Sequence, residues 1–518
     1  MGRTKELFLA AVPSMVTAFT AVPSGAQSIQ ISIQGDAPSL ISDFEIGVAH
    51  VNGGWQNGDP QAVSQAESHL SQLPLHNIHI MGWGLGNPEP SLGVYDWASL
   101  DAHMEMFASM GVVPMITLAT APGWMKPSGE DWNMQDRVAR EHEQDFANLS
   151  GRIAQRYPQV QYYQIWNEMK GYWSNDLGTY DYYEYTRLYN LVYGALKSAN
   201  PNAKIGGPYL NLAGNGVHDK VEEILDYWLT NADGADFVAC SGWSTGWPPN
   251  TAGDKPLKMQ NSAYFGQVTA AIRNLTELPV WIVEMYGGMT FEDPQFTATS
   301  HASSYLHALL NGTQNAIHWD PLDFGALITP TDVPAGGQPL PHLEAISMFH
   351  QHFGRGIEIY ASEASSPEVE SLVSAQKILL INKSPNSVTV DLEGTQITMA
   401  GYSHVLADTP AGAVAVRGDA PTDPTMDAAG GVPSAGVPLG GNLAGSPGGN
   451  TAQPGADAQF GTGGMASTDS SPGSLTTVAA HGSNGCAVRP LSQRRSWAWL
   501  LAALAAALAG VRRQSLPK

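Results

Sequence analysis

Residues 161–168 read QYYQIWNE, a short apolar run that ends on an asparagine and a glutamate. Runs of this length, separated by amphipathic stretches, predict the buried strands of a parallel sheet. Working outward from this run gives eight candidate strands: Phe44–Val51, His76–Trp83, Val112–Ala119, Gln161–Glu168, Ala203–Leu210, Asp236–Ser244, Pro279–Tyr286 and Ala316–Asp320. The sequence therefore predicts an α/β chain with a glutamate at the end of its fourth strand.

Helical periodicity fills the spaces between these strands. The expected helices are Ala98–Met110, Arg137–Tyr157, Tyr180–Ala199, Lys220–Asn231, Tyr264–Leu275 and Pro341–Phe353. Repeated strand–helix units of this kind predict a (β/α)8 TIM barrel over residues 40–353. A doubly wound sheet is the alternative, but no glycine-rich phosphate-binding fingerprint follows the first strand.

Two further segments follow the predicted barrel. Residues 354–408 predict a small C-terminal β domain, with short strands expected at Ile357–Tyr360, Lys377–Asn382, Ser387–Leu392 and Ser403–Leu406. Residues 409–485 are rich in Gly, Pro, Ala, Ser and Thr and hold one aromatic residue, Phe460. Such a composition cannot bury enough apolar surface to fold, so it predicts a disordered linker.

Both ends of the chain indicate export. Residues 1–26 have the order of a signal peptide: basic Arg3 and Lys5, an apolar stretch, then small residues ending at Ala26. The alternative is a buried N-terminal helix, against which Pro13 and Pro23 count. Residues 486–518 begin at a cysteine and contain an apolar run, 497–511, followed by two arginines. This run predicts a short hydrophobic helix.

The C-terminal segment resembles the sorting tags of myxobacteria, in which a Gly-Cys pair precedes a hydrophobic helix and basic residues. The resemblance implies that the tail interacts with sorting machinery. An ordinary membrane anchor is the alternative, although the run is shorter than the ~20 residues that span a bilayer comfortably. Either interpretation places the protein at the cell envelope or outer surface, or released from it. Cys240 and Cys486 lie in segments too different to predict a disulfide between them.

Composition excludes some classes of function. The formal net charge is −22, with 25 basic and 47 acidic residues. Nucleic-acid binding needs clustered Lys and Arg, so no nucleic-acid partner is expected. A neutral substrate fits this balance better.

A second glutamate stands in a position equivalent to the first. Residues 280–284 read VWIVE and place Glu284 at the end of the predicted seventh strand, as Glu168 ends the fourth. Active sites of TIM barrels lie at the carboxyl ends of the strands. Taken singly, either glutamate could be a structural residue. Together they provide the two carboxyls that cleavage of an acetal requires, one to protonate the leaving oxygen and one to stabilise the developing cation.

The motifs resemble clan A glycoside hydrolases, most nearly family 39, the β-xylosidases and α-L-iduronidases. The likeness is carried by Tyr95-Asp96-Trp97, Pro122-Gly123-Trp124, Trp166-Asn167-Glu168, Gly325-Ala326-Leu327-Ile328 and the proline-led helix Pro341–Phe353. It implies hydrolysis of O-glycosidic bonds with retention, Glu284 acting as nucleophile and Glu168 as acid/base. It further implies that Asn167 binds the sugar 2-hydroxyl. No cofactor is implied.

Other residues are candidates for substrate contact. Indole rings pack against the flat faces of sugars, and several lie at or near predicted strand ends: Trp83, Trp124, Trp243 and Trp319. His50 ends the first strand and either touches substrate or is a structural histidine. No metal site is expected, because no His-Glu-x-x-His occurs and the acidic run 141–145 fits a solvated helix face.

Two positions depart from the family. His79 stands where members usually carry an arginine on the second strand, and Ser241 and Trp243 stand where a histidine and a tyrosine are usual on the sixth. Both usual supports of the nucleophile are therefore replaced. A non-catalytic carbohydrate-binding pseudoenzyme remains the alternative function.

Overall fold

The structure is a computed structural model, and it describes residues 28–50, 55–82, 85–213, 219–244, 254–288, 293–322 and 325–414. Within these residues, eight parallel strands close into a barrel and follow one another around it in chain order. They are β3 (Glu45–Ala49), β4 (Leu75–His79), β5 (Val113–Leu118), β6 (Tyr162–Ile165), β9 (Lys204–Ala213), β10 (Phe237–Trp243), β11 (Val280–Tyr286) and β12 (Thr313–Trp319). The predicted TIM barrel is confirmed, each strand falling within or beside its predicted range.

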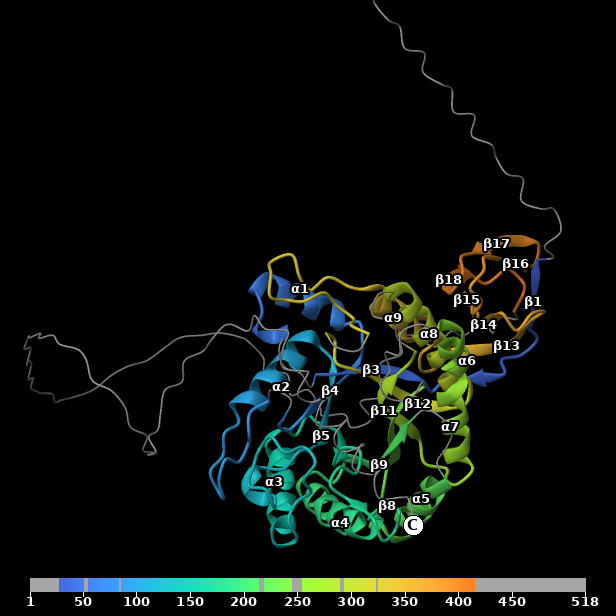
Figure 1. Ribbon diagram of the computed structural model, residues 1–518. Helices are drawn as coiled ribbons and strands as arrows, with labels where there is room; N and C mark the ends of the chain where they lie inside the picture. The colour runs from blue at the N-terminus through green and yellow to red at the C-terminus, as the bar shows by residue number, and fades with distance from the viewer. Residues whose placement is uncertain are drawn as a thin grey trace, which may run out of the picture. The chain divides into compact units, whose positions relative to one another are not determined.

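Helices surround the barrel (Figure 1). They are α1 (Pro60–Leu70), α2 (Ala98–Met110), α3 (Glu143–Arg156), α4 (Tyr182–Ala199), α5 (Asp219–Asn231), α6 (Lys255–Gln260), α7 (Tyr264–Arg273), α8 (Pro294–Leu310) and α9 (Pro341–Phe353). The predictions for α2 and α9 were right to the residue. No helix was predicted at α1, α6 or α8. The expected helix Arg137–Tyr157 was too long, because α3 begins at Glu143 after a single 3-10 turn, Arg140–His142.

The β domain is larger than the predicted C-terminal segment. Its strands run in the order β17-β16-β1-β13-β14-β15-β18, with β2 paired to β13. Their bounds are β1 (Ile29–Gln34), β2 (Leu40–Ile41), β13 (Glu358–Ala364), β14 (Val369–Ser374), β15 (Lys377–Asn382), β16 (Val388–Leu392), β17 (Thr395–Met399) and β18 (Ser403–Asp408).

Residues before the barrel thus complete a sheet formed mostly by residues after it. The strand β1 pairs antiparallel with β13 and parallel with β16. Its alternation buries Ile29 and Ile31 against the core of this sheet. The predicted linker, the C-terminal hydrophobic segment and the signal peptide lie outside the described residues.

Two apolar layers hold the barrel. One lies between the strands and the helices, and the other fills the interior of the barrel. Stacked rings belong to the interior layer: the centroids of Phe237 and Trp281 are 4.1 Å apart at an interplanar angle of 17°. Because this layer is packed solid, only the carboxyl ends of the strands remain for a site.

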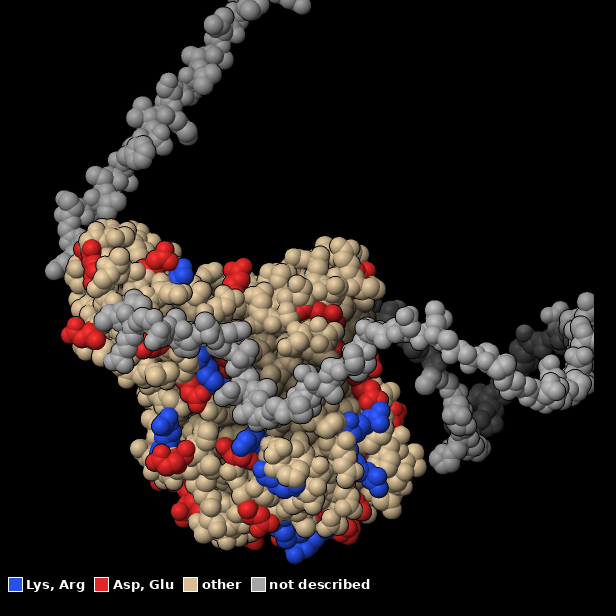
Figure 2. Space-filling view, turned by 180° about the vertical axis from the view of Figure 1, so that it is seen from behind, with Lys and Arg blue, Asp and Glu red and all other residues tan. Residues whose placement is uncertain are grey.

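Charged side chains of both signs are interspersed among the described residues on the face of the molecule drawn in Figure 2. Several basic side chains form ion pairs, among them Arg156 with Asp101 and Lys204 with Asp236. Among the helices that the structure describes, none is long and apolar enough to span a membrane.

Candidate active site

The segment after β6 presents Glu168 through an unusual backbone. Trp166, Glu168 and Met169 all have positive φ, at 67°, 48° and 49°. Left-handed conformations are rare for residues with side chains, cost about 1–3 kcal/mol each and cluster at functional sites. The turn buries the Glu168 side chain at the carboxyl end of the strand. Packing of Trp166 against Phe146 of α3, with ring centroids 5.6 Å apart, helps to hold it.

A bulge in β11 directs Glu284 into the barrel. Cys240 of β10 lies opposite Ile282, and the next residue, Ser241, lies opposite Glu284, so Val283 is an extra residue in β11. A bulge changes which side chains face each side of the sheet. As a result Trp281 and Glu284, three residues apart, both face the interior.

A second bulge directs Tyr209 toward Glu284. In β9, Pro208 and Leu210 pair with consecutive residues of β10, which leaves Tyr209 as the extra residue, with φ of 59°. The Tyr209 hydroxyl donates a hydrogen bond to Glu284 Oε1. Asn167 Nδ2 donates to the same oxygen at 2.8 Å. The Tyr286 hydroxyl lies 3.4 Å from Glu284 Oε2.

Different groups contact Glu168. The Ser241 hydroxyl donates to Glu168 Oε1 at 2.7 Å. The Lys170 ammonium donates to Glu168 Oε2 and to Asn167 Oδ1, both at 2.5 Å. Lys170 and Asn167 thus link the two glutamates, which the barrel brings together from strands distant in the sequence.

The two carboxyls differ in electrostatic environment. Burial, and then the charge of Glu168, raise the pKa of Glu284 to about 8. Burial alone would raise the pKa of Glu168 too, but the charge and hydrogen bond of Lys170 and the hydroxyl of Ser241 hold that pKa below its usual value. Burial therefore favours a protonated Glu284, and Lys170 favours an ionised Glu168.

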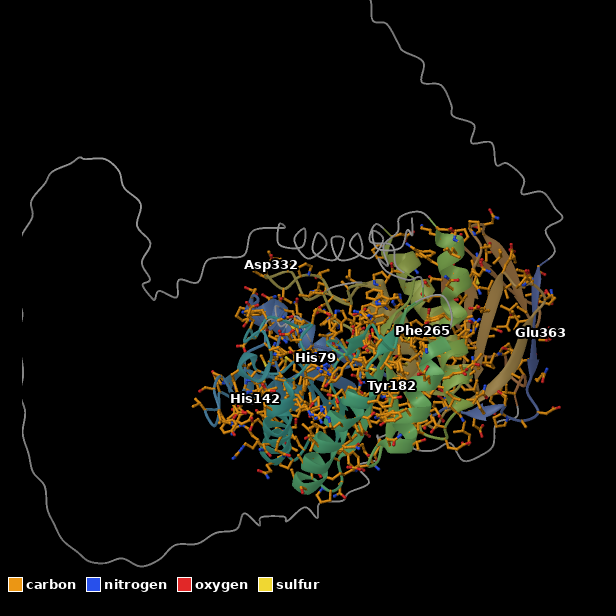
Figure 3. The ribbon with its side chains drawn as sticks, turned by 60° about the horizontal axis from the view of Figure 1, so that its bottom comes forward. His79, His142, Tyr182, Phe265, Asp332 and Glu363 are labelled. Atoms are coloured by element: carbon orange, nitrogen blue, oxygen red, sulfur yellow. The ribbon has the colours of Figure 1, made fainter. Side chains whose placement is uncertain are left out.

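Aromatic side chains lie beside the carboxyls. Trp243 and Tyr286 stack in parallel with centroids 3.5 Å apart, and Trp319 lies 6.2 Å from Tyr286. The ring of His79, which Figure 3 labels within the barrel, meets Trp319 edge to face at 5.9 Å. Burial and the nearby charge of Lys170 lower the pKa of His79 to about 3, so this imidazole is neutral.

Other predicted contact residues lie in different surroundings. Both ring nitrogens of His50 are in hydrogen bonds: Nε2 with His76 at 2.7 Å, and Nδ1 accepting from Trp55 at 3.2 Å. The Trp124 indole donates to the Glu89 carbonyl at 2.8 Å. Trp83 lies outside the described residues. Substrate contact by these three residues stays a prediction.

Sequence reasoning missed Tyr209, Lys170 and Tyr286. Tyr209 stands at the end of a predicted strand, a position that could have marked it, but only the bulge shows that it faces Glu284. Lys170 was easier to find from the sequence than Tyr209, because it lies two residues after Glu168. The replaced supports now have an explanation: Tyr209 and Asn167 hold the nucleophile candidate, while Ser241 holds Glu168 instead.

Comparison with known proteins agrees with the barrel fold. Residues 67–322 match the family model described as glycosyl hydrolases family 39. No curated protein matches the chain. Among solved structures, SrfJ from Salmonella typhimurium has a TM-score of 0.54 at 14% identity, with 74% of this chain and 93% of that chain covered. This likeness shows the shared fold.

Two further structures are similar at lower scores. A monomeric beta-xylosidase from Caulobacter crescentus CB15 has a TM-score of 0.48 at 17% identity, covering 69% of this chain and 77% of that chain. A family 39 enzyme from Xanthomonas axonopodis pv. citri has a TM-score of 0.49 at 20% identity, covering 70% and 77%. The family match confirms the resemblance that the sequence motifs predicted.

Proposed function

We propose that this glycoside hydrolase family 39 barrel cleaves O-glycosidic bonds of an oligo- or polysaccharide by double displacement with retention. The observation that carries the proposal is the coupled pair, Glu168 and Glu284, joined through Asn167 and Lys170. Retention requires two carboxyls about 5–5.5 Å apart, one of them ionised and one protonated.

In this mechanism Glu284 attacks the anomeric carbon and forms a glycosyl-enzyme. Glu168 gives its proton to the leaving oxygen, and then accepts a proton from the water that hydrolyses the intermediate. Asn167, which already donates to Glu284 Oε1, is placed to bind the neighbouring sugar hydroxyl. The rings of Trp243, Tyr286 and Trp319 offer apolar faces to the sugar.

The contact with Lys170 favours the ionised form of Glu168, whereas this chemistry needs the protonated form. A productive complex needs Glu284 ionised and Glu168 protonated, the reverse of the arrangement that Lys170 favours. Substrate must therefore bind to the minor protonation state or move Lys170 away from Glu168. This contact is also the observation that favours the second candidate, a carbohydrate-binding protein without turnover.

Turnover of a panel of aryl glycosides, combined with binding measurements on the matching sugars, separates the two. An enzyme releases the phenol at a rate that Glu284→Gln abolishes. A binding protein shows affinity in calorimetry without release by the wild type on any glycoside, an outcome that would remove the hydrolase proposal. A carbohydrate screen with product analysis then assigns sugar and linkage.

We also propose that the protein is exported and that residues beyond 408 retain it at the cell envelope. The support is the sequence: an N-terminal stretch with signal-peptide order and a C-terminal stretch like a sorting tag. A chain ending at residue 414, which keeps Thr409 and Val414 packed on the β domain, should fold and keep its turnover, but leave the envelope fraction. Equal retention of both chains would contradict this role of the tail.

A further inference from the structure

Three buried histidines meet outside the barrel, away from the glutamate pair. His318 is on β12, His301 is on α8 and His342 is in the first turn of α9. Their exposures are 0%, 0% and 1%. One ring nitrogen from each lies within 4.8 Å of those of the other two. Ile317 and Trp319 belong to the interior layer, so His318 faces the helices.

The hydrogen bonds of these rings leave nitrogen atoms unused. His342 Nδ1 donates to the Gly325 carbonyl at 2.5 Å, so Nε2 carries a lone pair. This Nε2 and both nitrogens of His318 are buried without a hydrogen-bond partner among the described residues. Leaving a buried polar atom unpaired costs about 1–3 kcal/mol. A ligand that binds these adjacent nitrogen atoms would therefore remove this cost.

His301 is engaged at both nitrogens. Its Nδ1 donates to the Thr297 carbonyl at 2.9 Å, which fixes the tautomer, and its Nε2 accepts from the Gly287 amide at 3.0 Å. A ligand at this ring would replace the bond to Gly287. The rings of His301 and His342 lie 4.0 Å apart, and those of His318 and His342 lie 4.6 Å apart.

We propose that His301, His318 and His342 bind one divalent transition-metal ion of the zinc, nickel or copper type. Imidazole is a preferred ligand of these ions, whereas magnesium and calcium require oxygen ligands. Metal ligation needs neutral imidazole. Burial lowers the pKa of His301 to about 4, and burial together with the neighbouring histidines lowers those of His318 and His342, so all three lone pairs are present at neutral pH.

Loading requires a small adjustment. Three nitrogens at 2.0–2.1 Å from a tetrahedral zinc lie roughly 3.3 Å apart, so nitrogens that lie within 4.8 Å of one another reach this spacing by small rotations of the rings. Three protein ligands leave a fourth position for water or hydroxide, which offsets part of the buried charge. The site would tie α8 and α9 to β12, and its role is structural, because none of its ligands contacts the two glutamates in the hydrogen bonds described above.

The test uses the full chain without a polyhistidine tag, stripped with a chelator and titrated with zinc or cobalt. Wild-type protein should bind one equivalent, show a higher melting temperature with metal, and give the visible spectrum of tetrahedral cobalt. His318→Gln and His342→Gln should weaken zinc binding by about tenfold or more. His103→Gln is the matched control, because His103 is also buried but is bonded to Gln56 and to the Ser99 carbonyl.

Near-ultraviolet circular dichroism verifies that each variant is folded. Less than one equivalent of zinc in the wild type at saturating metal would overturn the proposal. It would also be overturned if His103→Gln lost as much affinity as His318→Gln, since the metal would then bind elsewhere. The wild-type titration and cobalt spectrum decide the question even if a variant fails to fold.

Discussion

Replacing Lys170 by methionine should make the enzyme faster on unactivated glycosides. The Lys170 ammonium lies 2.5 Å from Glu168 Oε2, and both side chains are mostly buried, with 23% and 9% exposed. An opposite charge at such a distance typically lowers a carboxyl pKa by 1–3 units. Methionine keeps the volume of the side chain and removes the charge, so the pKa of Glu168 should rise by about the same amount.

This shift changes how often the pair is in its productive form. The pKa of Glu284 is about 8 and that of Glu168 is below 4.5. Burial favours the proton on Glu284 and Lys170 favours an ionised Glu168, so the productive form, with the proton on Glu168, is the minor one. Raising the pKa of Glu168 by 1–3 units increases the fraction of this form by at most about 10-fold to 1,000-fold. The charge of Lys170 also lowers the pKa of Glu284, so its loss raises that pKa too and offsets part of the gain. Any role of Lys170 in binding substrate reduces the gain.

The assay is the pH dependence of kcat/KM, which reports the free enzyme. For a glycoside with an alkyl leaving group, kcat/KM of Lys170→Met between pH 5 and 7 should exceed the wild-type value by up to about 10-fold. For a dinitrophenyl glycoside, which barely needs an acid, the wild-type rate should instead climb toward pH 8 as Glu284 ionises.

The matched control is Lys204→Met. Lys204 forms an ion pair with Asp236 at the opposite end of β9 from the site. The kcat/KM of the Lys204→Met variant should therefore equal that of the wild type. If Lys170→Met has the same pH profile as the wild type, or loses rate on both substrates, then Lys170 does not control the proton and the reasoning is wrong.

Three other changes probe the site and the barrel. Tyr209→Phe removes the hydrogen bond to the buried Glu284 carboxyl, which is worth about 1.5–3 kcal/mol. The variant should fold, and its kcat on an aryl glycoside should fall by roughly 10-fold to 100-fold. Glu284→Gln should raise the melting temperature at pH 9 more than at pH 5. The wild-type protein loses stability as pH rises from 4.5 to 8, because the pKa of Glu284 is raised to about 8 in the folded state, and glutamine removes this loss. An equal gain at both pH values would count against that pKa. Gly206→Ala should lower the free energy of unfolding by several kcal/mol, because its Cβ would lie 2.0 Å from the Phe237 ring. Gly194→Ala in α4 is the control: its Cβ meets open space, so urea unfolding should show a gain of about 0.5–1 kcal/mol.

Periodicity was sufficient to predict the barrel. Most strands carry short apolar runs, and α2 and α9 are bounded by Gly111 and by Pro341, which are strong local signals. The helix α8 was missed because it is buried nearly all round and lacks an amphipathic pattern. The strand β1 was missed because a six-residue alternating run forms a stable strand only when it pairs with β13, more than 300 residues away in the sequence.

The candidate site was predictable as a pair of residues and not as a network. The ends of the fourth and seventh strands identified Glu168 and Glu284. The contacts that set their charges depend on bulges at Tyr209 and Val283, where one added residue reverses the direction of the side chains that follow. The hydrophobic periodicity of the sequence does not show where such a bulge occurs. The histidine cluster was hidden for the same reason, since its three members come from three separate elements.

The configuration of the glycosyl azide formed by two variants tests the central claim most directly. Glu284→Ala lacks the nucleophile, so azide should attack from the nucleophile's face and give a product of inverted configuration. Glu168→Ala should still form the glycosyl-enzyme from an activated aryl glycoside, and azide should release it with retention, because azide needs no general base. The account predicts opposite anomers from the two variants by proton NMR. The same anomer from both would contradict the assignment of Glu284 as nucleophile and Glu168 as acid/base.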